Sequence, residues 1–546
     1  MQPESFFITT AIDYTNGAPH IGHAYEKVLA DVIARYQRMA GREVFFLTGV
    51  DQHGQKVQQS AEKQGVAPQE FVDGVTAKFR ALWDKLDVRY DAWAATTDDL
   101  HKECVRANLQ MLWDDKDPAT GESRWIYKKS EGGYYSVRQE QFLTDKERGE
   151  DGEFGPEWQP VEFREEENFY FRLKDHKQWL LNFIDKRSAD GKPFVVPDFR
   201  VGELRNAVEK LDGDLCISRP VARLQWGIPF PESFGAGFVT YVWFDALVNY
   251  ISFVPGHDPK AKAGSDSEFA RWWPALHVIG KDIMIPAHGV YWPIMLKALG
   301  YKDEEMPTLL VHGWWNISGA KMSKSLGNVI DPDVLADKYG AEAVRYYLMS
   351  DIATGKDSDF SEERLIQRYN SDLANSLGNL LNRTLNMVAK YREGKLKLNS
   401  DVPNDIMSGV VRYRLRMESS GSDSPVNVDL TDQPLYQVNN CLACVIEMTN
   451  WCNQFIDSKA PWKLAKDPAQ ADQLDAVLYT LAESLRIIAI LISPVLPKAA
   501  AAIFMQLNRD GPMTLAEATW GKLPDGHILG TPTPIFPRIQ PPETAS

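Results

Sequence analysis

The hydrophobic and polar positions of the first 50 residues change period twice. Phe6 to Thr10 is an apolar, β-branched run that predicts a strand, and the turn-rich stretch 14–19 follows it. From Ile21 to Met39 the apolar residues recur at helical spacing, and Gly41 stands where such a helix would end. Val44 to Thr48 predicts a second strand. Strand, helix and parallel strand indicate half of a nucleotide-binding unit.

The pattern becomes irregular over residues 116–235. This stretch is rich in Glu, Gly, Tyr and Trp and contains short strand-like pieces at Gly133 to Val137 and Asn168 to Phe171, so it predicts an insertion. Strand signals that would complete the sheet resume at Phe238 to Trp243, His277 to Ile279 and Leu309 to Val311. The fold class expected is α/β, a split Rossmann-like, doubly wound parallel sheet with its active site at the carboxyl ends of the strands.

Beyond Glu362 strand signals nearly vanish and long helical periodicities predict an all-α bundle. A polar loop, Ser419 to Pro425, interrupts it, and a proline-rich tail follows Leu529. We therefore expect five segments: the first half of the catalytic domain (1–115), the insertion (116–235), the second half (236–305), a connecting region with a lysine-rich loop (306–361), and the helical unit with its tail (362–546).

Composition narrows the class. The 546 residues are too many for one core, and 44% hydrophobic with 25% charged residues is ordinary globular composition. A net charge of −15 argues against nonspecific binding to nucleic acid, so we expect no DNA partner and only local contact with RNA. The sequence shows no signal peptide and no apolar run of bilayer length, and its five cysteines suit a reducing compartment. We expect a cytoplasmic protein that does not bind membranes.

Two short motifs carry candidate chemistry. His20-Ile21-Gly22-His23 stands at the first strand-to-helix turn, where backbone N–H groups and the helix dipole favour anions, and Glu26 follows one turn later. Capping or solvated histidines are the alternative. Lys321-Met322-Ser323-Lys324-Ser325 follows a small-residue stretch, so its ammonium and hydroxyl groups could close on phosphate. A solvated lysine loop is the alternative.

In this order the two motifs resemble the signature pair of class I aminoacyl-tRNA synthetases, and further segments between Phe7 and about Lys498 resemble the methionyl-tRNA synthetase family. The resemblance implies an enzyme that activates L-methionine with ATP and Mg²⁺ and transfers it to tRNA(Met). It implies a stem-contact region at 306–361. The implied catalytic residues are His20, His23, Lys321 and Lys324, and the implied ATP-binding residues are Gly22, Glu26, Gly280, Asp282, Met322, Ser323 and Ser325.

The same resemblance implies a methionine pocket. Asp51 would pair with the α-ammonium group, and aromatic rings would select the thioether by packing and sulfur–aromatic attraction. Between Asp282 and Trp292 the chain carries about one residue more than the family pattern. The implied pocket residues are Ile12, Asp51, Trp243, Ala246, Tyr250 and His288.

The insertion departs from many relatives. Where they open a zinc knuckle with Tyr-Cys-x-x-Cys-Glu, this chain has the run Tyr135 to Glu140, which lacks both thiols. Tetrahedral zinc needs three or four Cys or His ligands, so we expect no structural zinc. Cys441 and Cys444 lie in a segment of helical spacing without histidine, which favours buried helical cysteines over a metal site.

By resemblance the helical unit binds the anticodon. Asn375, Asn379 and Arg383 are spaced four apart on one predicted helix face and could read bases splayed from a tRNA loop; a solvated face is the alternative. Trp462 after Pro461 would stack on a base, or would simply pack at a helix start. We expect a monomer. A relative specific for leucine, isoleucine, valine or cysteine, or a non-catalytic paralogue, remains open at this point.

Overall fold

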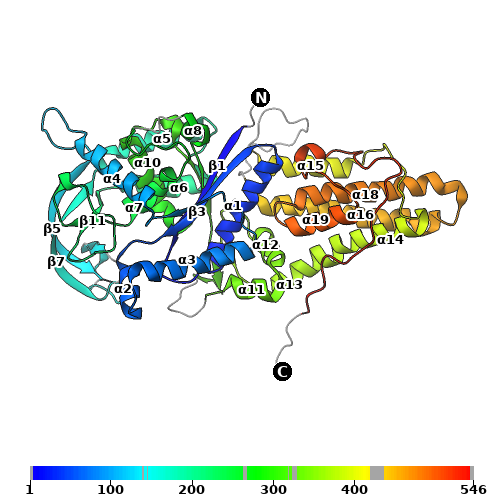
Figure 1. Cartoon of the computed structure of the whole chain (residues 1–546), viewed down its shortest axis with the longest axis horizontal. Helices are drawn as coiled ribbons and strands as arrows, with labels where there is room; N and C mark the ends of the chain where they lie inside the picture. Colours follow the sequence, from blue (N-terminus) through cyan, green and yellow to red (C-terminus); the bar gives the residue numbers. More distant parts are fainter. Residues whose placement is uncertain are drawn as a thin grey trace, which may run out of the picture.

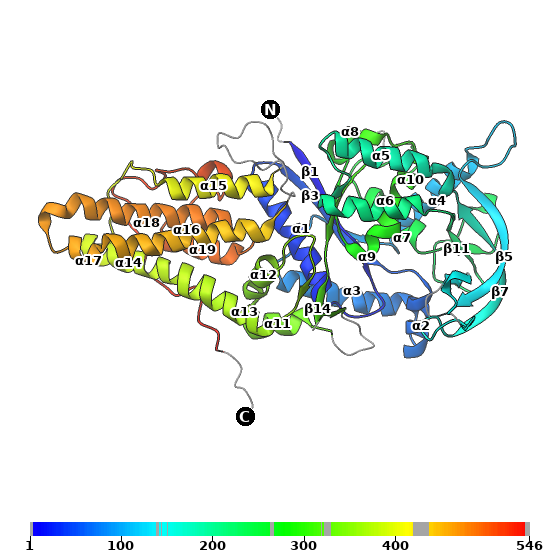
Figure 2. The same cartoon turned by 180° about the vertical axis from the view of Figure 1, so that it is seen from behind.

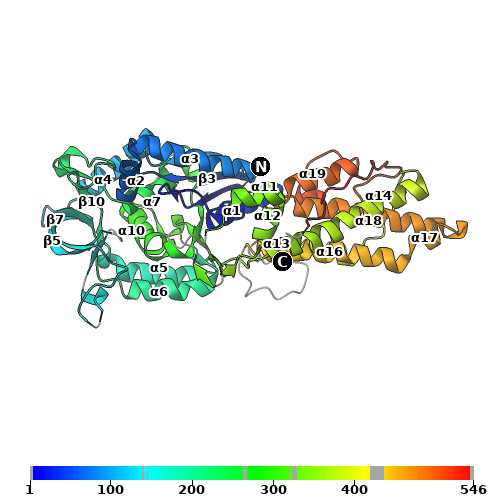
Figure 3. The same ribbon diagram turned by 90° about the horizontal axis from the view of Figure 1, so that it is seen from below.

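The structure is a computed structural model that describes residues 4–137, 141–143, 145–149, 151–261, 267–317, 319–321, 329–418 and 436–540. The molecule is elongated: a bundle of helices occupies one end, the antiparallel strands of the insertion occupy the other, and a parallel sheet lies between them (Figures 1 and 3). Both the α/β class and the helical unit expected from the sequence are confirmed.

The central sheet is parallel at every pairing and runs in the order β2-β3-β1-β12-β13-β8, with β4 beside β3. Its central strands are buried on both faces, as their continuous apolar runs require. The strands are β1 (Ser5–Thr10), β2 (Asp13–Tyr14), β3 (Glu43–Asp51), β4 (Ala92–Ala95), β8 (Val195–Val196), β12 (Leu276–Gly280) and β13 (Thr308–His312).

Helices cover both faces of the sheet. The one that places the site is α1 (Ile21–Met39), which has the bounds that the sequence periodicity predicts. The other helices within residues 1–115 and 236–305 are α2 (Gln55–Gln64), α3 (Pro68–Lys85), α4 (Asp99–Asp114), α7 (Trp243–Ser252), α8 (Ser267–Trp272), α9 (Lys281–Ile283), the π-helical segment η5 (Met284–Tyr291) and α10 (Trp292–Ala298).

The insertion contains a four-stranded antiparallel sheet rather than short irregular pieces. It is built from β6 (Gln141–Leu143), β5 (Ile126–Ser136), β7 (Val161–Phe171) and β9 (Leu215–Cys216), and it is flanked by α5 (Lys177–Ala189) and α6 (Val201–Glu209). One strand of the central sheet, β8, comes from within this stretch of the chain.

One sequence-based expectation was wrong. Phe238 to Trp243 does not rejoin the central sheet: β11 (Phe238–Thr240) forms a separate antiparallel pair with β10 (Ser218–Pro220), and Trp243 already begins α7. An apolar run of this length does not specify its partner strand, and here the partner is the end of the insertion.

A three-stranded sheet and two helices connect the catalytic half to the bundle: β14 (Trp315–Ile317), β15 (Ala320–Lys321), β16 (Ser358–Asp359), α11 (Pro332–Tyr339) and α12 (Ala341–Ser350). The bundle comprises α13 (Glu362–Arg368), the π-helical η8 (Tyr369–Gly378), α14 (Asn379–Arg392), α15 (Asn404–Met417), α16 (Val438–Lys459), α17 (Pro461–Leu464), α18 (Ala471–Ile492) and α19 (Pro497–Gln506). The polar loop predicted at 419–425 lies outside the described residues.

The bundle and the α1 face of the sheet share one continuous hydrophobic core, and the insertion shares a second core with the opposite face. The five expected segment boundaries stay predictions. No helix within the described ranges is long and apolar enough to cross a membrane.

Candidate active site

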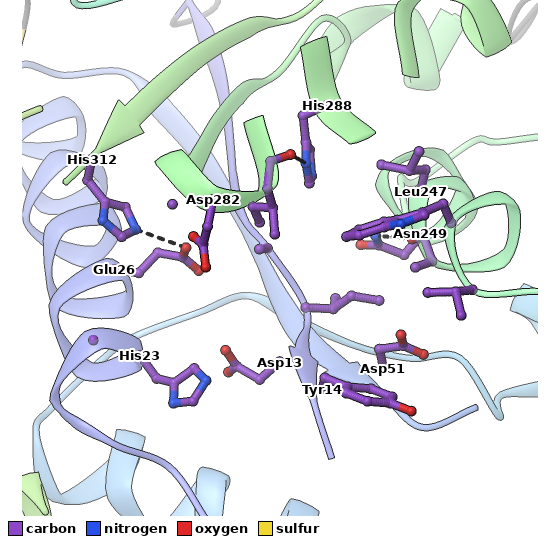
Figure 4. A pocket seen from close by; sticks show the side chains of 18 of the residues that line it. Asp13, Tyr14, His23, Glu26, Asp51, Leu247, Asn249, Asp282, His288 and His312 are labelled. Atoms are coloured by element: carbon purple, nitrogen blue, oxygen red, sulfur yellow. Dashed lines mark hydrogen bonds and ion pairs between the residues drawn. The ribbon is translucent and has the colours of Figure 1, made fainter. Parts of the chain in front are cut away.

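A cavity of about 550 Å³ opens at the carboxyl ends of the central strands. It lies where β1 leads into α1 on one side and β12 lies on the other, which is the point in a doubly wound sheet where ligands bind. Twelve of the residues predicted for catalysis or for binding ATP or methionine line this one cavity: Ile12, His20, Gly22, His23, Glu26, Asp51, Trp243, Ala246, Tyr250, Gly280, Asp282 and His288. Figure 4 shows His23, Glu26, Asp51, Asp282 and His288 among the side chains that line it.

The two signature histidines form the start of α1 itself. His20 is the N-cap and its Nδ1 accepts the Gly22 N–H at 3.1 Å, while Nδ1 of His23 accepts the His20 N–H at 3.1 Å. Their rings stack with centroids 3.7 Å apart. Because each Nδ1 is an acceptor, each ring carries its proton on Nε2. Gly22 leaves room for the His20 ring, since a Cβ at this position would come within 2.9 Å of it.

Asp51 ends β3 on the opposite wall of the cavity and is 7% exposed. Burial and the nearby charge of Asp245 raise its pKa to about 7. Asp245 is buried in α7 and accepts hydrogen bonds from His53 at 2.7 Å and from His101 at 2.9 Å. Burial opposes ionisation of Asp245, but these two histidines lower its pKa to about 2. The network ties the end of β3 to the helix that carries Trp243.

The pocket predicted for the methionine side chain is formed by α7 and η5. The Tyr250 hydroxyl lies 2.7 Å from His288 Nε2, and His288 Nδ1 lies 2.8 Å from the Ile283 carbonyl. The carbonyl can only accept, so Nδ1 carries the proton; burial lowers the pKa of His288 to about 4, which keeps the ring neutral. Nε2 therefore accepts from the Tyr250 hydroxyl.

The chain between Asp282 and Trp292, where the sequence indicated about one extra residue, is irregular. The chain there forms the π-helical segment η5, in which Ile285 leaves helical geometry at φ −115° and ψ 128°. A π-turn holds one more residue than an α-turn and occurs often at functional sites. His288 is thereby directed into the cavity although its spacing departs from the family pattern.

Several residues of the cavity wall carry no motif and were missed by the sequence reasoning. His312 Nε2 lies 3.1 Å from Glu26 Oε2, and the buried Lys27 ammonium joins Glu26 to Asp13. The only sequence signal for this group was a lysine among apolar helix positions, because a lysine is almost never fully buried unless it is paired.

The lysine-rich loop is described only at its start. Lys321 belongs to β15, which pairs with β14, and Trp315 at the start of β14 lines the cavity. Met322, Ser323, Lys324 and Ser325 lie outside the described residues.

The residues predicted to read the anticodon lie on the bundle. Asn375 and Asn379 are exposed at the junction of η8 and α14, and Arg383 pairs with Asp457 of α16 at 2.7 Å. Trp462 is 41% exposed in α17, which lies toward the far tip of the bundle (Figure 2). The bundle thus separates Trp462 from the cavity.

An aromatic and charged cluster surrounds Tyr135, at the start of the run that resembles the zinc knuckle of relatives but lacks its thiols. Tyr135 is fully buried, with the Arg164 and Arg223 guanidinium groups 4.6 and 3.9 Å from its ring, and Arg223 pairs with Glu166 at 2.8 Å. Within the described ranges no three His, Cys, Asp or Glu residues gather as a metal site. Arg138 to Glu140 lie outside these ranges.

Cys441 and Cys444 behave as the sequence indicated. Both are buried in α16 as free thiols, and burial raises the pKa of each. A raised thiol pKa disfavours the thiolate that metals bind.

The histidines at the start of α1 and the carboxylate after β12 lie on opposite sides of the cavity, at the point where the order of the strands reverses. The helical bundle packs behind α1. This is the architecture of a class I aminoacyl-tRNA synthetase. A family model described as "tRNA synthetases class I (M)" matches residues 6–151 and 157–385, and one described as "Anticodon binding domain of methionyl tRNA ligase" matches residues 438–546. The chain belongs to the methionine–tRNA ligase family.

Full-length relatives agree. The methionine–tRNA ligase of a Nostoc species is 38% identical over 98% of this chain and 98% of its own length, and that of Deinococcus radiodurans is 39% identical over 98% and 75%. The structure of Mycobacterium tuberculosis methionyl-tRNA synthetase in complex with methionyl-adenylate superposes with a TM-score of 0.84 at 34% identity, covering 98% of this chain and 100% of that one.

Proposed function

We propose that the cavity binds ATP and methionine side by side and joins them as methionyl-adenylate, which the chain then transfers to tRNA(Met). One observation carries this: the residues predicted for both substrates line a single cavity. The methionine carboxylate attacks the α-phosphorus of ATP, the bond to the bridging oxygen breaks, and pyrophosphate leaves. The terminal adenosine hydroxyl of the tRNA then attacks the adenylate carbonyl and AMP leaves.

The proposed roles follow from position. Asp51 pairs with the α-ammonium group, while Ile12, Trp243, Ala246, Tyr250 and His288 enclose the thioether. On the opposite side, Gly22, Glu26, Gly280 and Asp282 hold the adenosine. His20 and His23 direct Nε2–H groups to the triphosphate, where negative charge builds on the leaving pyrophosphate. Lys321 and Lys324, with Met322, Ser323 and Ser325, complete the phosphate site.

ATP enters with Mg²⁺ in this proposal, because a triphosphate needs a cation in a site that contains carboxylates. The bound ion would lower the charge on the phosphates. We infer no structural zinc, because the run Tyr135 to Glu140 lacks both knuckle thiols, and metal analysis of the purified protein tests this. A monomer in the cytoplasm remains our expectation.

Anticodon reading is proposed for Asn375, Asn379, Arg383 and Trp462. The exposed indole of Trp462 offers a platform on which an unstacked base is worth roughly 1–3 kcal/mol. Asn375 and Asn379 present amides that can read base edges.

Exchange of labelled pyrophosphate into ATP tests the activation step directly. We expect exchange that depends on methionine and is far slower with leucine. A folded preparation that gives no exchange, or equal exchange with leucine, would end the proposal.

A further inference from the structure

Lys27 is fully buried beneath the cavity and all of its donors are used by the protein. Its Nζ donates to the Ala11 carbonyl at 2.9 Å, to Asp13 Oδ1 at 2.6 Å and to Glu26 Oε1 at 2.8 Å. An ammonium group has three N–H donors, so none remains for a substrate. Lys27 therefore holds the cavity wall together and does not itself bind phosphate.

The carboxylate of Asp13, which accepts from Lys27, forms hydrogen bonds through only one of its two oxygens among the described residues. Asp13 lines the cavity and is 5% exposed, and its Oδ2 is buried without any hydrogen-bond partner among the described residues. Figure 4 shows the carboxylate between the His23 ring and Asp51. A buried acceptor without a partner is unfavourable, and a ligand at that oxygen would supply the missing interaction.

The charges around Asp13 indicate which ligand fits. Both oxygens of Glu26 are engaged, one by Lys27 and one by His312. A carboxylate on the triphosphate side of the cavity would repel the phosphates unless a cation lay between them. Lys27 cannot be that cation, because all of its N–H donors are used within the protein. Mg²⁺ is commonly bound through one or two carboxylates together with substrate phosphates.

We propose that Asp13 Oδ2 is a ligand of the Mg²⁺ that accompanies ATP, and that Lys27 is the positioning residue that aims it. This rests on the proposed function, because it needs the triphosphate at the His20 and His23 end of the cavity.

Asp13→Asn separates the two halves of this assignment. The asparagine Oδ1 still accepts from Lys27, while the amide NH₂ replaces Oδ2 and cannot bind a metal. The probe is Mn²⁺, whose free concentration is followed by electron paramagnetic resonance as the full chain is titrated with ATP and no methionine. We expect Asp13→Asn to weaken Mn²⁺·ATP binding by roughly 10–100-fold, the usual cost of disturbing a metal site.

Asp351→Asn is the matched control, because Asp351 is another largely buried carboxylate, paired with Arg364 and Arg368 outside the cavity. It should leave Mn²⁺·ATP binding unchanged. Lys27→Met should also weaken binding, and the double variant with Asp13→Asn should be no weaker than Asp13→Asn alone, because both act through one oxygen.

Two results separate this inference from the proposed function. If Asp13→Asn binds Mn²⁺·ATP as tightly as the unmodified chain, and that chain catalyses methionine-dependent exchange, the metal ligand is refuted and the function stands. If the unmodified chain shows no exchange, the proposed function itself fails. If Lys27→Met does not fold, Asp13→Asn alone tests whether Asp13 is a metal ligand.

Discussion

Replacing Tyr250 with Phe removes one hydroxyl from the side of the cavity that is proposed to bind methionine. That hydroxyl donates to His288 Nε2 at 2.7 Å, and both side chains are buried. His288 keeps its proton on Nδ1 through the Ile283 carbonyl, so its Nε2 would be left as a buried acceptor without a partner. Such a loss costs about 1–3 kcal/mol, which corresponds to roughly 5–150-fold in an equilibrium constant.

We expect that penalty in kcat/KM for methionine, with KM for ATP unchanged, because the aromatic ring and its stacking on His277 remain. Methionine-dependent pyrophosphate exchange at varied methionine and ATP measures both. Tyr479→Phe is the matched control: Tyr479 is equally buried and donates to the Leu523 carbonyl at 2.7 Å, but in the bundle. It should lower the melting temperature only. Equal effects on both substrates in Tyr250→Phe would refute the reasoning.

Three other substitutions test separate parts of the molecule. Trp462→Ala should weaken tRNA charging while pyrophosphate exchange is preserved, since the indole is exposed on the bundle; equal loss of both would contradict the separation of sites. Asp245→Asn removes a negative charge that raises the pKa of Asp51. The acid limb of the pH profile of kcat/KM for methionine, expected near pH 7, should therefore move to lower pH. A shift to higher pH would count against the pairing of Asp51 with the α-ammonium group. Arg345→Met breaks a fully buried ion pair with Asp31 and should lower the free energy of unfolding by about 3–5 kcal/mol. Denaturant unfolding should show a lower midpoint. An unchanged midpoint would show that the fold does not need this ion pair.

The sequence predicts those elements whose signals are local. The helix Ile21–Met39 has apolar residues at a steady period and ends before a glycine at φ 91°, so both of its bounds could be placed. The strands before and after it are short apolar runs between turn signals. Residues attached to the carboxyl ends of parallel strands must meet at one edge of the sheet, which located the site, whereas the roles of Asp51 and Asp282 within it came from the family resemblance.

Contacts between residues that are far apart in the sequence could not be predicted. Asp245 and His53 are 192 positions apart, and no periodicity indicates that they meet. The two-residue strand β8 is too short to give a pattern, and β11 has the composition of a core strand but pairs with the insertion. The π-helical turn before Trp292 was visible only as a residue too many, because insertion of one residue does not specify whether a loop or a helix absorbs it.

The helix α1 serves two parts of the molecule at once. Its first turn carries His20 and His23, while its middle residue Asp31 accepts from Arg345 at 2.7 Å. The same guanidinium donates to the carbonyls of Pro494 and Val495, in the turn between α18 and α19 of the bundle. A shift of the bundle against the sheet must therefore break buried, charge-assisted hydrogen bonds or move α1 with it. Arg345 therefore connects the turn between α18 and α19 to the helix whose first turn lines the cavity.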